Sequence, residues 1–218
     1  LVIPFDSVVM HEGDLDRFFI SLSNVSLPKK RFISELEFVP TEPGLVHHAN
    51  GHLLLYKEGS KRMPLRPRRK MEARSEMNSD LGSLLEMQAD DGSLPMRIHS
   101  AFNYLPGVQG IEYPNGIGAF EVTKDFAAVM NDVHYGPADK TVLDRSVLNV
   151  FFTDVAPKRA TGELMLGTNG VSKIVPKLLI PANQKTKHVS RYTIAEDISV
   201  LTINPHLHQL GKSFWAFA

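Results

Sequence analysis

The strongest constraint on the fold of this chain is a series of short apolar runs, each closed by turn-forming residues. The runs are rich in Val, Ile, Phe and Leu, and Pro, Gly, Asn and Asp separate them, which is the pattern of β-strands joined by turns. We expect strands at residues 32–39, 53–56, 126–130, 146–153, 177–180, 192–194 and 199–203. Many short strands of this kind are typical of a sandwich or jelly roll. The sequence therefore predicts an all-β fold made of antiparallel jelly-roll sandwich domains.

The length and the end of the chain suggest two domains. A chain of 218 residues is long enough to bury a sizeable core in one large or two small domains. The turn-like segment 154–158 predicts a boundary between a first domain, residues 1–155, and a second, residues 156–218. The apolar segment 213–218 has the character of a strand with exposed Phe and Trp. We therefore expect the second domain to be incomplete here, with a further segment or a partner chain covering this edge.

Residues 57–95 interrupt the strand pattern. Residues 61–70 are strongly basic, and residues 80–87 can form a short helix capped by Ser79 or Asp80. A basic run can bind nucleic acid, but no aromatic residues alternate with these charges, and 24 basic residues balance 24 acidic ones overall. We expect a solvated insertion loop and no nucleic-acid partner, while docking of a protein partner stays open.

Histidines recur at spacings that suit metal binding. His206 and His208 follow the expected strand at 199–203, and side chains two residues apart in a strand leave the same face. His47 and His48 are adjacent, so their rings can share an ion only where the strand ends or bulges. His134 follows the apolar run 126–130. Taken singly, each motif is common in proteins without a metal.

The other histidines are weaker candidates for metal ligands. His52 lies four residues after His48 and is the one competitor for a ligand role. His11, His99 and His188 have no paired ligand at a useful spacing.

The order of these motifs resembles that of the copper type II, ascorbate-dependent monooxygenases, the family of peptidylglycine alpha-hydroxylating monooxygenase and dopamine beta-monooxygenase. The shared elements are His-His, then Val-His-Tyr-Gly, then Pro-His-x-His-x-x-Gly-Lys. Segments 102–107, 113–118 and 179–181 look like framework segments of the family and occur in its order. The resemblance covers most of the chain from about Phe19 onward, except residues 57–95, and is closest to bacterial members.

The resemblance implies two copper sites. His47, His48 and His134 would bind the electron-transfer copper, and His206 and His208 would be two ligands of the oxygen-binding copper. The family completes that second site with a downstream methionine, and no methionine follows His208 in this sequence. Asp132 stands where animal members carry glutamine.

The implied activity is that of a copper-dependent monooxygenase. Such an enzyme hydroxylates an activated carbon–hydrogen bond of a small-molecule or peptide substrate, using oxygen and an ascorbate-type reductant. The histidine ligands themselves suit copper or zinc. The alternative is a non-catalytic copper-binding or structural jelly-roll subunit of a larger assembly.

Other sequence features exclude some classes and bear on location. The chain has no cysteine, so disulfides and thiolate ligands are absent. It has no apolar run long enough for a membrane-spanning helix. Residues 1–5 lack the charged start of a signal peptide, so we expect a mature or trimmed product. Copper and oxygen chemistry implies an extracytoplasmic location, periplasmic or secreted. No Gly-x-Ser-x-Gly elbow or phosphate loop occurs, and no catalytic side chain is singled out.

Overall fold

The computed structural model describes residues 1–73, 81–108, 110–114, 116–159, 161–168, 170–207 and 210–218. The chain forms two compact units, Leu1–Glu163 and Leu164–Ala218. The first unit extends past the expected boundary at residue 155, because backbone hydrogen bonds tie its last segment to the preceding loop. Lys158 N donates to Gly116 O at 3.1 Å, and Thr161 N donates to Ala119 O at 3.2 Å.

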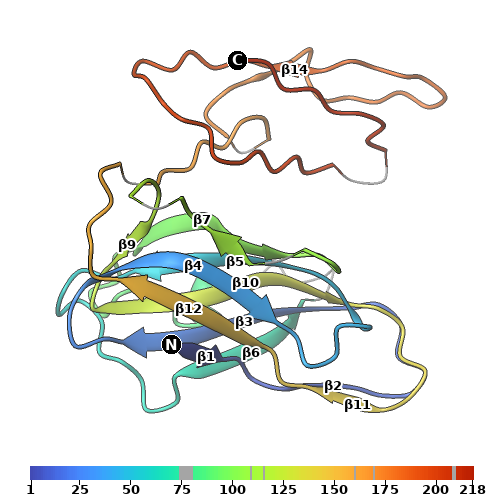
Figure 1. Cartoon of the computed structure of the whole chain (residues 1–218). Helices are drawn as coiled ribbons and strands as arrows, with labels where there is room; N and C mark the ends of the chain where they lie inside the picture. The colour runs from blue at the N-terminus through green and yellow to red at the C-terminus, as the bar shows by residue number, and fades with distance from the viewer. Residues whose placement is uncertain (74–80, 109, 115, 160, 169, 208–209) are drawn as a thin grey trace. The chain divides into compact units, whose positions relative to one another are not determined.

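The first unit is an all-β, sandwich-like arrangement, and every pairing between its named strands is antiparallel (Figure 1). One sheet has the order β1-β12-β4-β8, with β9 also paired to β4. Its strands are β1 (Val2–Pro4), β4 (Arg31–Val39), β8 (Ile111–Glu112), β9 (Phe120–Val122) and β12 (Val147–Thr153).

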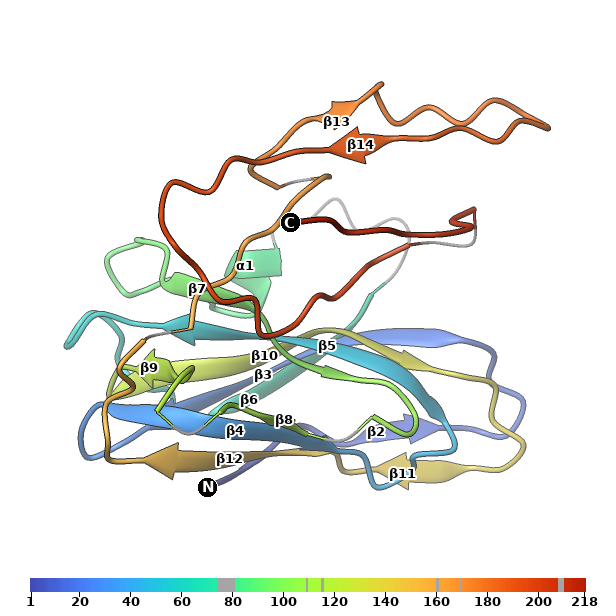
Figure 2. The same cartoon turned by 45° about the horizontal axis from the view of Figure 1, so that its top comes forward.

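The second sheet carries the histidines of interest and has the order β6-β3-β10-β5-β7. Its strands are β3 (Arg17–Ser26), β5 (Val46–Leu55), β6 (Arg68–Ala73), β7 (Met96–Tyr104) and β10 (Asp125–Tyr135). A separate two-stranded sheet pairs β2 (Val8–Met10) with β11 (Val142–Asp144). Figure 2 shows β4 and β12 in one layer and β3, β5 and β10 in the other.

The main core lies between these two layers. Alternate residues of β10 face it, among them Phe126, Ala128 and Met130, each at most 2 % exposed. Ile33 and Leu148 contribute from the opposite sheet. This alternation follows from the two-residue period of a strand, and it leaves the intervening residues of β10 on the outer face of the second sheet.

The segment 57–95 covers part of that outer face, and the prediction of a solvated loop was wrong. Residues Arg68–Ala73 form the edge strand β6, which pairs with β3. The helix α1 (Leu81–Leu84) precedes Leu85, which is 2 % exposed and packs in a second apolar cluster with Leu54 and Val129. The expected caps Ser79 and Asp80 lie outside the described residues. Apolar side chains within the segment, hidden among its charges, are the reason it packs onto the sheet.

Several basic side chains of this segment make polar contacts with other parts of the first unit. Arg69 forms an ion pair with Glu86 at 2.6 Å, and Lys61 Nζ donates to the backbone oxygens of Glu86 and Gln88. Lys70 donates to the backbone oxygen of Ser7. The run therefore holds the segment in place along the sheet.

The second unit has little regular structure among its described residues. Only β13 (Ile174–Val175) and β14 (Val189–Ser190) pair there, and the strands expected at 177–180, 192–194 and 199–203 are not formed. No described residue from 164 to 218 is buried. Leu179 is 74 % exposed and Val200 is 59 % exposed. Apolar, β-branched residues favour a strand chiefly when a partner strand and a packed face are present, and here they have neither.

Helices long and apolar enough to cross a membrane do not occur among the described residues.

Candidate metal centre

The candidate centre lies on the outer face of the second sheet, where β5 and β10 pair irregularly. His134 pairs with His48, but the next residue of β10, Tyr135, pairs with Val46. His47 is therefore an extra residue in β5, and it forms a β-bulge. Adjacent residues of a regular strand point to opposite faces, and a bulge removes this restriction. His47 and His48 both lie beside His134 for this reason, as the sequence required of a shared site.

The three rings are close together. The ring centroids of His47 and His134 are 4.8 Å apart, and those of His48 and His134 are 5.2 Å apart. His47 is exposed, while His48 and His134 are half-buried. The centre is thus open to solvent on one side and supported by the sheet on the other.

Gly136 makes room for the ring of His47. A Cβ atom at position 136 would lie 2.5 Å from Nε2 of His47, closer than any real side chain allows. The backbone N–H of Gly136 donates to Leu45 O at 2.8 Å, which fixes this approach. The glycine is needed here for space.

His134 is oriented by contacts on two sides. Its ring stacks on Phe18 at a centroid distance of 4.2 Å and an interplanar angle of 14°. Its Nε2 lies 3.1 Å from Oδ1 of Asp16. The ligand atoms of Asp16, His47 and His134 all lie within 4.8 Å of one another, so these three residues form a group that can hold a metal ion.

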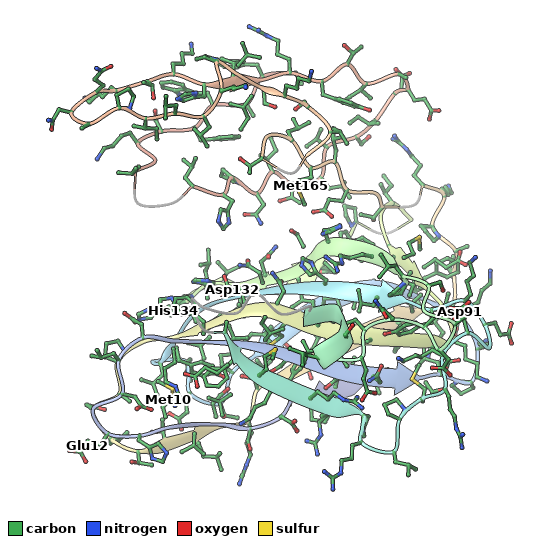
Figure 3. All side chains as sticks on the ribbon, turned by 180° about the vertical axis from the view of Figure 1, so that it is seen from behind. Met10, Glu12, Asp91, Asp132, His134 and Met165 are labelled. Carbon is green, nitrogen blue, oxygen red and sulfur yellow. The ribbon has the colours of Figure 1, made fainter. Side chains whose placement is uncertain are left out.

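His48 makes a different polar contact. Its Nε2 lies 3.0 Å from Oδ2 of Asp132, which is two residues before His134 on the same strand (Figure 3). A second bulge in β10, at Asn131, precedes this point. The carboxylate orients the ring of His48 at the edge of the centre.

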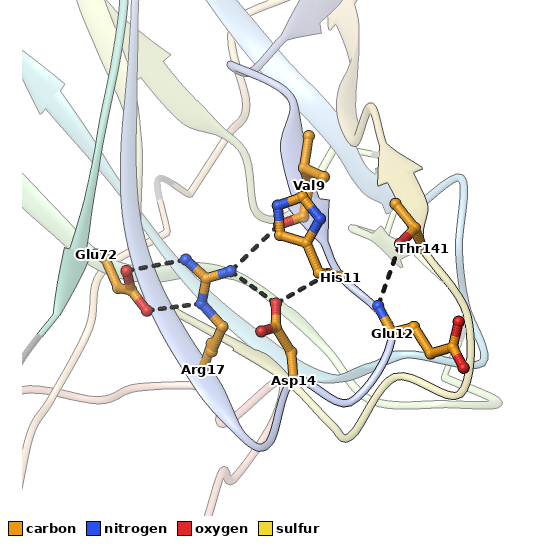
Figure 4. Close-up of polar contacts among 7 residues, drawn as sticks. All are labelled: Val9, His11, Glu12, Asp14, Arg17, Glu72 and Thr141. Carbon is orange, nitrogen blue, oxygen red and sulfur yellow. Dashed lines mark hydrogen bonds and ion pairs between the residues drawn. The ribbon is translucent and has the colours of Figure 1, made fainter.

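An ionic clamp holds the turn that presents Asp16 (Figure 4). Arg17 binds both carboxylate oxygens of Glu72, at 2.7 and 2.9 Å, and its Nη1 donates to Asp14 Oδ2 at 2.9 Å. The Glu72 carboxylate raises the pKa of Arg17 further above its already high value. The backbone N–H of His11, followed by Arg17, lowers the pKa of Asp14. Asp16 thus lies between two residues that are fixed by charged hydrogen bonds.

A buried carboxylate holds the loop that leads into β5. Asp144 is 1 % exposed and accepts hydrogen bonds from the N–H and hydroxyl of Thr41, the N–H of Glu42, the Tyr135 hydroxyl and the Ser146 hydroxyl. Burial, with the Asp144 charge, raises the pKa of Tyr135. This network joins the end of β10 to the segment before His47.

A second histidine pair lies on the same sheet but is suited to a structural role. The rings of His52 and His99 are 5.1 Å apart. The N–H of Ser100 donates to Nδ1 of His52 at 3.1 Å, so a neutral His52 carries its proton on Nε2 and offers no free lone pair. Burial lowers the pKa of His52 to about 4, with smaller contributions from Arg97 and His99.

Of the second pair of expected ligands, His206 is exposed in an irregular segment, so the strand that was expected to carry it is not formed there. His208 lies outside the described residues.

The residues of the centre fit a transition-metal ion. Imidazole nitrogens and a carboxylate oxygen are common ligands of zinc and of divalent copper, and the backbone at Gly136 leaves the space that the His47 ring needs. Asp16 was missed in the sequence, because its polar turn shows no spacing relation to either histidine motif. Only the pairing of β3 with β10 brings it beside His134.

Comparison with known proteins yields no match, either to a protein-family model or to a curated protein.

Proposed function

We propose that this chain is a copper-dependent monooxygenase, in which the centre on β5 and β10 binds the electron-transfer copper. The substrate would be a small molecule or peptide with an activated carbon–hydrogen bond. Oxygen and an ascorbate-type reductant would be the co-substrates, in an extracytoplasmic location. The resemblance of the histidine motifs in the sequence is the basis for choosing this chemistry.

One observation carries the proposal: the β-bulge at His47. A regular strand would separate His47 from His48, and no metal site could use both. The bulge lies at His47, and the rings of both His47 and His48 lie beside that of His134. Two further features support a site at this point, the space left by Gly136 and the stacking of His134 on Phe18.

In this proposal His47, His48 and His134 hold the ion. A bound copper ion supplies a one-electron redox couple. The chain's own part is to fix the rings: Phe18 sets the plane of His134, Asp132 orients His48, and the open side admits a reductant. His206 and His208 stay proposed ligands of a second copper, for which the structure offers no supporting geometry.

Metal analysis of the purified chain tests the first site. We expect His134→Ala to lower the copper stoichiometry by one while the far-ultraviolet circular dichroism stays that of a β protein. The matched control is His188→Ala, because His188 lies in the second unit and its ring contacts Pro176 O and Thr186. Equal copper content in the wild-type chain and His134→Ala would refute the site.

Oxygen consumption under ascorbate, measured on the same copper-loaded samples, tests the enzymatic part. Consumption that depends on His134, with a hydroxylated product from a peptide or small-molecule library, supports the monooxygenase. Copper bound at His134 without any ascorbate-dependent oxygen consumption would instead favour a non-catalytic copper-binding subunit.

A further inference from the structure

Asp16 faces the same point in space as two of the histidines. Its carboxylate oxygen Oδ1 lies 3.1 Å from Nε2 of His134, and its ligand atom lies within 4.8 Å of that of His47. In a tetrahedral site with bonds of about 2.0–2.1 Å, neighbouring ligand atoms are about 3.3 Å apart. The ligand atoms of Asp16 and His134 already have nearly this spacing. A small movement of the exposed His47 ring would bring its nitrogen to the same distance from both.

The position of Asp16 is fixed from both sides. Arg17 is held by Glu72 and Asp14 (Figure 4), and the backbone oxygen of Asp14 accepts the N–H of Ala138 at 3.0 Å. This ties the turn to the end of β10, close behind His134 and Gly136. Because the backbone of this turn is fixed, Asp16 loses less conformational entropy when its carboxylate binds an ion.

His48 is differently placed. Its Nε2 lies 3.0 Å from Asp132 Oδ2, much as that of His134 lies 3.1 Å from Asp16 Oδ1. Among the described residues, however, neither His48 nor Asp132 belongs to the group whose ligand atoms all lie within 4.8 Å of one another. In the described arrangement Asp16 is therefore better disposed to ligate with His47 and His134.

We propose that Asp16 is a direct ligand of this metal site, so that the site prefers divalent ions over monovalent copper. This inference rests on the proposed function only for the location of the site. The physical reason is ligand chemistry: a carboxylate is a hard, anionic ligand that suits divalent ions, while monovalent copper prefers softer ligands.

The test is a pair of competition titrations on the full chain, one with Zn(II) and one with Cu(I) held by a chelator. Zinc gives a readout that is independent of any redox activity. We expect Asp16→Asn to weaken Zn(II) binding by about tenfold or more and Cu(I) binding by less than about threefold. Asp16 is an exposed residue, with a side chain that is 55 % accessible, so the variant should fold normally.

The matched control is Asp132→Asn. This substitution removes the same negative charge beside the same three histidines. The Asp132 carboxylate is hydrogen-bonded to the ring of His48 and not to those of His47 or His134. We expect Asp132→Asn to change the ratio of Zn(II) to Cu(I) affinity by less than about threefold, because orienting a ligand affects both ions alike. A ratio that changes equally in both variants would show a general charge effect and overturn the assignment of Asp16.

Two further outcomes would also overturn it, and they separate this inference from the proposed function. Suppose that His134→Ala abolishes metal binding, while Asp16→Asn lowers the affinities for Zn(II) and Cu(I) equally or leaves both unchanged. The site then exists, and Asp16 is not a direct ligand in it. If His134→Ala leaves both affinities unchanged, the metal site itself is absent and the proposed function fails with it.

Discussion

The backbone of Gly136 lies against the imidazole of His47, where a Cβ atom would stand 2.5 Å from Nε2 and 2.6 Å from Cε1 of that ring. His47 lies in β5 and Gly136 directly follows β10, and their approach depends on the bulge at His47. Any side chain at position 136 must displace the ring from His134.

We therefore predict that Gly136→Ala weakens metal binding by about tenfold to a hundredfold, the usual range when a residue that positions a ligand is changed. Titration with Zn(II) measures the effect. Gly44→Ala is the control, since a Cβ there would meet nothing within 4 Å. Wild-type affinity in Gly136→Ala would mean that the ring of His47 takes no part in binding.

Asp144 should matter for stability because it gathers five hydrogen-bond donors in a buried position. We expect Asp144→Ala to lower the free energy of unfolding by about 2–4 kcal/mol, since the donors lose a charged partner and some stay buried. Urea denaturation measures this. The exposed Asp139, replaced by Ala, should change stability by less than about 0.5 kcal/mol. A loss of under about 1 kcal/mol in Asp144→Ala would contradict the role assigned to this network.

The segment 57–95 should contribute to the stability of the first unit through Leu85. Replacing this side chain, which is 2 % exposed, with Ala should cost about 2–4 kcal/mol because it leaves a cavity against the sheet. Its neighbour Leu84 is 51 % exposed, so Leu84→Ala should change stability by less than about 0.5 kcal/mol. Equal effects of the two substitutions would show that the segment does not pack as described.

The buried His52 predicts a dependence of stability on pH. Burial lowers its pKa from 6.5 to about 4, so the unfolded chain binds a proton more readily than the folded chain between these values. The contribution of neutral His52 to the free energy of unfolding is fully present above about pH 6.5 and is lost as the pH falls toward 4.

Urea unfolding at pH 7 and pH 5 measures this loss, and His52→Asn is the comparison. The Asn side-chain oxygen can accept the Ser100 N–H in place of Nδ1 but does not titrate in this range. We expect the variant to lose less stability than the wild type between the two pH values. An identical loss in both would assign the pH dependence to other groups.

The sequence by itself determined the all-β class and four of the twelve strands that the structure describes in the first unit. The runs at 32–39, 53–56, 126–130 and 146–153 lie within or overlap β4, β5, β10 and β12. Their runs of apolar residues, bounded by turn residues, are a local signal that is visible without any knowledge of the partner strands. The order of the histidine motifs was also visible, as was the condition that His47 and His48 need either a strand end or a bulge to act together.

Only the tertiary structure decided how these elements meet. The bulge at His47, the space at Gly136 and the place of Asp16 beside His134 depend on pairings between strands far apart in the sequence. The packing of Leu85 onto the sheet was not predicted, because the many charged residues of the segment 57–95 indicated a solvated loop. In the second unit, the apolar runs at 177–180 and 199–203 formed no strands among the described residues, because a strand takes its stability from a partner and a buried face. The local sequence pattern shows that a segment is able to form a strand. Whether it forms one depends on the partner strand and the packed face that the tertiary structure provides.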